Sequence, residues 1–154
     1  MVELYLGIKW LHIICACIGF GSNVTHLFWI IAANRDPVHR ANILRLVKKI
    51  DDRMAVPSYI VAVTCGSIMW FWQWPGSSSW LIASVFLTAL LATAGIMYGP
   101  FMKKWIRLAN GETEGAKDGQ ALPVLARRLT WLWGGITGSA FLILFLMVRK
   151  PMLW

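Results

Sequence analysis

Residues 5–33, YLGIKWLHIICACIGFGSNVTHLFWIIAA, decide the fold of this chain. The run is long enough to cross a bilayer, which takes about 20 predominantly apolar residues in a helix. It contains no Asp, Glu or Arg, and Lys9 lies close to its start. The pattern therefore predicts a membrane-spanning helix.

Nearly all the polar residues of this predicted helix, together with one glycine, gather on one stripe. The stripe consists of His12, Gly19, Asn23 and His26. At 100° per residue, these four positions fall within about 60° of one another. Polar groups inside a membrane are costly and usually point toward other helices. We therefore expect the stripe to be buried in the protein, and Trp10 and Phe28 to face lipid or a partner.

The composition places the whole chain in the membrane class. Its 154 residues are 58% hydrophobic and only 14% charged, with a mean hydropathy of +0.60. Four apolar runs are long enough to cross a bilayer. The predicted spans are residues 5–33, 55–74, 80–102 and 129–148. They predict an all-α, up-and-down four-helix transmembrane bundle, with residues 1–154 forming a single integral membrane domain.

The charged residues lie in two loops of this predicted bundle. The chain has 15 Lys and Arg residues, and all but Lys9, Arg149 and Lys150 fall within residues 34–54 and 103–128. The positive-inside rule then places both loops in the cytoplasm and both termini outside. This arrangement explains the net charge of +8 without a nucleic-acid partner. The expected partners are the lipid bilayer, another membrane protein or a second copy of the chain.

The segments between the spans carry weaker patterns. The apolar residues of the first loop, Ile43, Leu46, Val47 and Ile50, recur at helical spacing. An amphipathic surface helix and a solvated basic loop explain that spacing equally well. Residues 74–80 predict a tight turn, and residues 109–123 a glycine-rich loop. Glycine pairs four residues apart in the last two spans allow close helix contacts.

Heme is the cofactor that these residues suit best. A dedicated metal-ion site would need three or four converging ligands, whereas heme iron needs one or two axial ligands and an apolar slot between helices. His12 and Met69 lie at similar depths in their predicted spans, so the two can share one heme. His26 lies roughly 21 Å from His12 along the helix. It is thus a candidate ligand for a different heme, and bis-histidine ligation would require a dimer. For each histidine, the alternative is an ordinary buried imidazole hydrogen-bonded within the bundle.

Short motifs in the first two spans resemble known membrane proteins. The motifs are Tyr5-x-x-Ile8-Lys9-x-Leu11-His12-Ile13-Ile14, then Gly19-Phe20, and Asp52, Pro57 and Gly66. They resemble an uncharacterised family of small predicted four-helix integral membrane proteins of bacteria, which implies the bacterial cytoplasmic (inner) membrane.

The Lys9-x-x-His12 spacing is also distantly similar to the HemJ-type protoporphyrinogen oxidase, a heme-b protein. That family carries Trp-Leu-His-x-Lys at the start of its third helix, where this chain has Trp80-Leu81-Ile82-Ala83-Ser84. The resemblance thus implies a heme position at His12 rather than the oxidase reaction.

Two functions of different classes follow from these observations. In the first, the protein holds heme b through His12, with Met69 as the sixth ligand, for electron transfer with quinone or a partner redox enzyme. In the second, it is a non-catalytic accessory subunit that packs against a larger membrane complex. The lack of an acid–base constellation and the small-residue helix faces favour the second. The sequence leaves open whether the protein is an enzyme.

Overall fold

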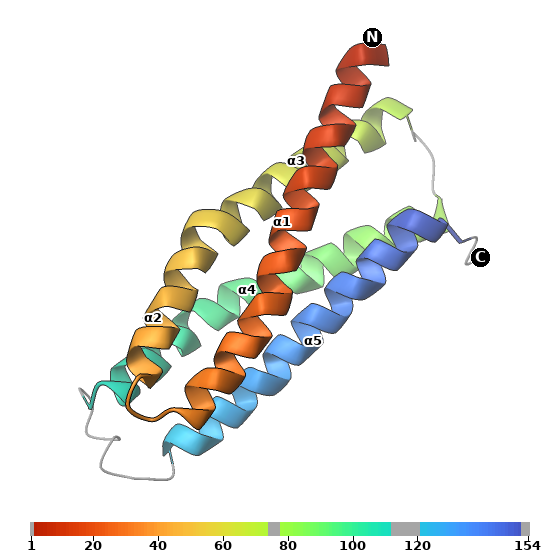
Figure 1. Ribbon diagram of the computed structural model, residues 1–154. Helices are drawn as coiled ribbons and strands as arrows, with labels where there is room; N and C mark the ends of the chain where they lie inside the picture. The colour runs from red at the N-terminus through yellow and green to blue at the C-terminus, as the bar shows by residue number, and fades with distance from the viewer. Residues whose placement is uncertain (1, 74–77, 112–120, 152–154) are drawn as a thin grey trace.

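In the part of the chain that the structure describes, four long helices run alternately up and down (Figure 1). The computed structural model describes residues 2–73, 78–111 and 121–151. The long helices are α1 (Val2–Arg35), α3 (Val56–Gln73), α4 (Ser79–Ala109) and α5 (Ala121–Arg149). A shorter helix, α2 (Arg40–Ile50), and a π-helical segment, η1 (Asp51–Ala55), lead into α3. Within the described residues, four helices are long and apolar enough to cross a membrane, which confirms the predicted fold class.

The two ends of the bundle differ in charge. We call the end at Val2 and Arg149 the terminal end, and the end at the α1–α2 turn the basic end (Figure 1). At the basic end, α4 and α5 extend beyond their predicted spans, to Ala109 and from Ala121. Hydropathy locates only the part of a helix that crosses the lipid. The backbone hydrogen bonds of the helix continue into the polar residues on either side. The turn predicted at 74–80 and the loop predicted at 109–123 fall mostly outside the described residues.

Most of the first predicted loop is helical, and from Arg40 the helix runs without a break into α3. The backbone passes through η1 just before Pro57, which lies in the first turn of α3 as predicted. Proline lacks an N–H and clashes with the carbonyl four residues earlier. Inside a continuous helix it therefore distorts the pattern of backbone hydrogen bonds. A short π-helical segment is one such distortion. Because α2 and η1 contain charged residues and α3 contains none, α3 is the part of this continuous helix that crosses the membrane.

Helix α2 buries a different face from the one predicted. Leu44 and Val47 are buried, whereas Leu46 is 48% exposed. The difference arises because α2 packs against both α1 and α4 rather than lying alone on a lipid surface. A helix in the first loop is therefore confirmed, but its buried face packs on the protein, and its place on a membrane surface stays a prediction.

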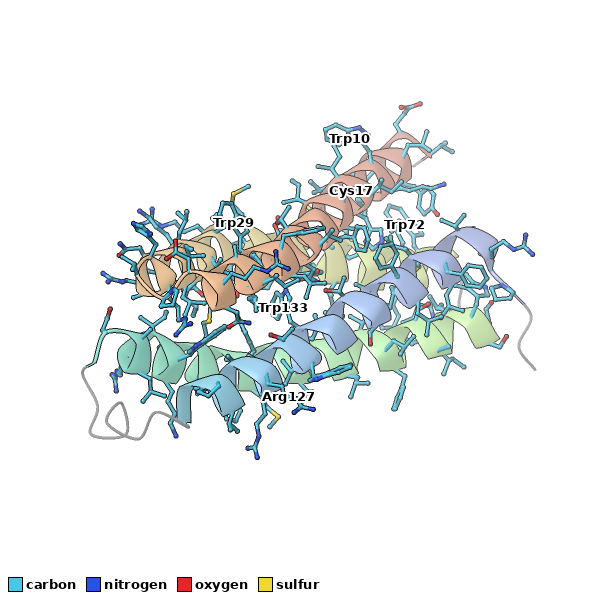
Figure 2. The ribbon with its side chains drawn as sticks, turned by 60° about the horizontal axis from the view of Figure 1, so that its bottom comes forward. Trp10, Cys17, Trp29, Trp72, Arg127 and Trp133 are labelled. Carbon is cyan, nitrogen blue, oxygen red and sulfur yellow. The ribbon has the colours of Figure 1, made fainter. Side chains whose placement is uncertain are left out.

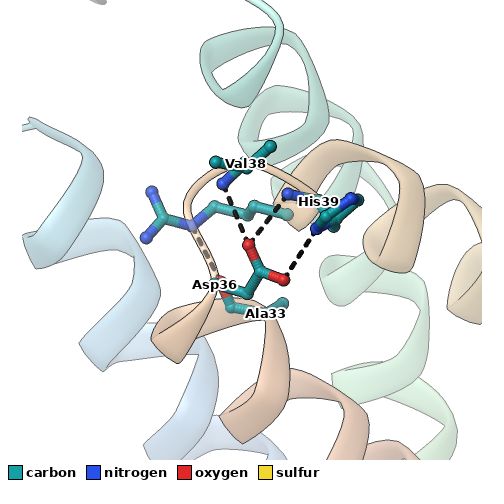
Figure 3. Close-up of polar contacts among 5 residues, drawn as sticks. Ala33, Asp36, Val38 and His39 are labelled. Carbon is teal, nitrogen blue, oxygen red and sulfur yellow. Dashed lines mark hydrogen bonds and ion pairs between the residues drawn. The ribbon is translucent and has the colours of Figure 1, made fainter.

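A compact turn centred on Asp36 joins α1 to α2 (Figure 3). Its Oδ1 atom accepts hydrogen bonds from the backbone N–H groups of Val38 and His39, both at 3.1 Å. Its Oδ2 atom lies 2.8 Å from Nδ1 of His39. The Nε atom of Arg40 donates to the carbonyl of Ala33 at 2.9 Å. These bonds satisfy backbone groups that the ends of two helices leave open.

The largest buried cluster lies in the basic half of the bundle. It joins α1, α2, α4 and α5 through Ile30, Ala33, Leu44, Val47, Tyr98, Met102, Trp105, Ala126, Leu129, Trp133 and Ile136. Helix α3 contributes nothing to this cluster. Among the described residues α3 packs on α1 and contacts neither α4 nor α5, so toward the terminal end the bundle separates into an α1–α3 pair and an α4–α5 pair (Figure 1).

Candidate functional site

The polar stripe of α1 faces the other helices, as the sequence predicts. Gly19, Asn23 and His26 are buried, and His12 is half-buried. Trp10 is 65% exposed and Phe28 68% exposed, and Figure 2 shows Trp10 pointing away from the bundle. The predicted rotation of the helix is therefore confirmed.

His12 is held by the backbone of α3. Its Nδ1 atom lies 2.7 Å from the carbonyl oxygen of Ala62. A carbonyl only accepts hydrogen bonds, so Nδ1 is the donor in this contact and Nε2 is the ring nitrogen left over. The same arrangement, with one ring nitrogen bonded to a carbonyl, orients histidines that bind metals through the other nitrogen.

Gly66 makes room for the His12 ring. A Cβ built on Gly66 would lie 3.1 Å from Cε1 of His12 and 3.4 Å from its Nδ1. Any side chain at this position would press on the imidazole. The close helix contacts therefore occur at Gly66 and at Gly19, which meets Tyr59. A Cβ built at Gly95, Gly99, Gly134 or Gly138 meets nothing within 4 Å, so their spacing does not mark close contacts.

Met69 lies on the face of α3 that turns toward α1. Ala62 and Cys65 of this face are buried, and Met69 is half-buried. Met69 lies seven residues beyond Ala62, about 10 Å along the axis. Helical side chains lean toward the N-terminus of their own helix. Because α1 and α3 run antiparallel, His12 leans toward the terminal end and Met69 leans away from it, which brings their tips toward one level.

His26 occupies a separate site in the basic half. It is 1% exposed, and its ring centroid lies 5.2 Å from that of Trp133 on α5. Tyr98 of α4 packs on the same indole at 4.5 Å. Neither ring nitrogen of His26 nor the Tyr98 hydroxyl has a hydrogen-bond partner among the described residues. The structure thus places His26 against Trp133 of α5, whose indole also carries Tyr98 of α4.

A hydrogen-bonded network links α1 to its neighbours at the middle of the bundle. The side-chain amide of Asn23 donates to the Tyr59 hydroxyl of α3. The indole N–H of Trp133 donates to the backbone carbonyl of Asn23 at 3.2 Å (Figure 2 labels Trp133 between the helices). These contacts fix the α1–α3 pair that carries His12 onto α5.

The sequence reading missed Trp133 and Trp105. Tryptophans of membrane proteins favour the membrane interface, but these two are 3% and 0% exposed. Trp10 and Trp131, at 65% and 74% exposed, agree with that preference. One signal that separates the two sets is helical phase, since Trp133 shares a face with the buried Leu129, Ile136 and Ala140.

Comparison with known proteins identifies a family for almost the whole chain. Residues 6–151 match the model of a family described as "Predicted integral membrane protein (DUF2269)". No curated protein and no solved structure matches the chain.

Proposed function

The chain belongs to the DUF2269 family of predicted integral membrane proteins, and within this membrane setting we propose that it holds heme b through His12. The protein then passes electrons between the heme and quinone or a partner redox enzyme. The observation that carries the proposal is the bond from Nδ1 of His12 to the Ala62 carbonyl, which fixes the ring and leaves Nε2 to bind iron. We place the protein in the bacterial cytoplasmic membrane.

The residues around His12 fit a heme ligand. The imidazole is anchored through one nitrogen, is only half-buried, and lies where α3 is separate from α4 and α5. Met69 supplies a soft thioether on the facing stripe of α3. When bound, heme b supplies a one-electron couple, and a methionine ligand raises its potential relative to bis-histidine ligation. The protein contributes ligand orientation and an apolar surrounding that excludes water.

A reduced-minus-oxidised absorption spectrum of the purified protein tests this function. We expect a heme-b spectrum after expression with ample heme supply, its loss in His12→Ala, and an altered spectrum in Met69→Leu. His26→Ala is the matched control, because His26 lies in the other half of the bundle. A coloured parent whose spectrum survives His12→Ala but not His26→Ala would move the ligand to His26.

Gly66 offers a second test that leaves every candidate ligand in place. Gly66→Leu would press a side chain against the His12 ring, so we expect less heme per protein. Gly95→Leu is the control, because a Cβ there meets nothing within 4 Å. Equal heme contents in the two variants would contradict the assignment of His12.

The accessory-subunit function is the second candidate. The separation of the α1–α3 pair from the α4–α5 pair favours it, because each pair leaves apolar helix faces without a covering helix. Phe71 of α3 and Phe86 of α4 are 79% and 70% exposed. A colourless protein after expression with ample heme supply, together with co-purification of a larger membrane complex, would favour this function over the first.

A further inference from the structure

A shallow open depression lies on the outer side of α5 near the basic end. It measures about 470 Å³ and is lined by Val124, Arg127, Arg128 and Trp131. These positions are spaced i, i+3, i+4 and i+7, so all four lie on one face of the helix. Figure 2 shows Arg127 pointing away from the bundle. The depression therefore opens to the surroundings of the protein and not to its core.

The charges of this depression select an anion. Arg127 and Arg128 are both exposed, and neither has a carboxylate partner within the described part of the chain. Lys103 and Lys104 of α4 are exposed at the same end of the bundle but do not line the depression. Guanidinium groups bind phosphate oxygens through paired hydrogen bonds, which gives geometric selectivity in addition to charge attraction.

The neighbouring apolar surface indicates that the anion is part of a lipid. Trp131 is 74% exposed, and exposed tryptophans favour the headgroup level of a membrane. The same face continues toward the terminal end through the exposed residues Gly135, Gly138 and Leu142. A Cβ built on either glycine meets nothing within 4 Å, so the strip is smooth. Trp131 and Leu142 lie about 16 Å apart along the axis, roughly one leaflet of a 30 Å core.

We propose that α5 binds an anionic phospholipid, with the headgroup phosphate held by Arg127 and Arg128 and one acyl chain lying along Gly135 and Gly138. In other membrane proteins, basic pockets on the cytoplasmic side of transmembrane helices bind acidic lipid headgroups. This site is separate from His12, because His12 lies in the first half of α1 toward the terminal end, whereas Arg127 and Arg128 lie near the start of α5 at the basic end.

Lipid retention by the full-length protein tests the proposal. The protein is purified in detergent, equilibrated with phosphatidylglycerol or phosphatidylcholine, and the bound lipid is counted by native mass spectrometry. We expect phosphatidylglycerol to bind at one molecule per chain with a clear preference over phosphatidylcholine. Arg127→Gln with Arg128→Gln should lower that preference roughly 30-fold, at about 1 kcal/mol for each arginine.

Lys103→Gln with Lys104→Gln is the matched control, since it removes the same charge from the same end of the bundle. We expect this variant to keep the bound phosphatidylglycerol. Equal losses in the two double variants would overturn the site and leave only a general attraction to basic residues. A third arm adds inorganic phosphate alone. If phosphate displaces phosphatidylglycerol at millimolar concentration, the site binds a soluble phosphate and the lipid assignment is wrong.

Discussion

Gly19 of α1 lies directly against the aromatic ring of Tyr59 of α3. A Cβ built on Gly19 would come within 2.9 Å of the ring atoms Cε1 and Cζ. The Tyr59 hydroxyl also accepts a hydrogen bond from Asn23, one turn further along α1, so the ring cannot turn aside without losing that bond. The absence of a side chain at Gly19 thus sets the spacing of the α1–α3 pair.

Gly19→Ala should therefore destabilise the protein by about 1–3 kcal/mol through overpacking, and Gly19→Leu by more. For a chain of this length, 1 kcal/mol corresponds to roughly 2–4 °C in Tm. Gly21→Ala is the control, because a Cβ there meets nothing within 4 Å, and alanine favours a helix over glycine. Thermal unfolding in detergent measures both. Equal Tm values for Gly19→Ala and Gly21→Ala would show that α1 and α3 pack less closely than described.

The Asn23–Tyr59 hydrogen bond should contribute a measurable coupling energy. In a double-mutant cycle of Asn23→Ala and Tyr59→Phe, we expect a coupling of about 0.6–1.7 kcal/mol, the range for such bonds between membrane helices. Tyr98→Phe is the contrasting variant, because the Tyr98 hydroxyl is buried without a partner among the described residues. Its removal should be neutral or stabilising. A coupling near zero would mean that the bond does not hold the helix pair.

The arrangement of the spans and the rotation of α1 could be predicted from the sequence because both follow from local patterns. Hydropathy locates a span, and the helical phase of His12, Gly19, Asn23 and His26 locates its buried face. The hydrogen-bond partner of His12 could not be predicted to the residue. The backbone carbonyl of Ala62 has the same chemistry as every other carbonyl of α3, and only the packing of the two helices selects it.

The aromatic surroundings of His26 also lay beyond the sequence reading. Trp133 lies far from His26 along the chain, and the two rings meet only because α1 packs on α5, while Tyr98 of α4 packs on the same indole. Tryptophan is common both at the membrane interface and in helix contacts, so residue type alone does not separate Trp133 from Trp131. The close helix contacts that the sequence allowed at the glycine pairs of α4 and α5 are absent at those glycines. A spacing of four residues permits a close contact but does not require one.

Acid should weaken the turn between α1 and α2. The backbone N–H and then the ring of His39 hold the pKa of Asp36 below its ordinary value of 3.8. A carboxylate with a lowered pKa in the folded state stabilises that state above its ordinary pKa, and the contribution disappears as the pH falls through the lowered value.

The measurement is the difference in Tm between the parent and Asp36→Asn from pH 3 to pH 6. The asparagine keeps an acceptor for the N–H groups of Val38 and His39 but carries no charge. We expect the parent to be the more stable protein at pH 6 and the difference to shrink as the pH falls below 3.8. A difference that stays constant over this range would show that the charge of Asp36 contributes nothing to the turn.

The orientation of the bundle is the prediction that links the charge pattern to the proposed site. The exposed lysines Lys103 and Lys104, together with Arg127 and Arg128, lie on helices at the basic end, and the positive-inside rule places that end in the cytoplasm with both termini outside. Single cysteines at Ser78 and Lys104, in a variant with Cys15, Cys17 and Cys65 replaced by alanine, report the two ends separately. In intact cells a membrane-impermeant maleimide should label Ser78→Cys and not Lys104→Cys, and permeabilised cells should show both. Labelling of Lys104→Cys alone in intact cells would reverse the orientation, and would move His12 from the outer half of the membrane to the inner half.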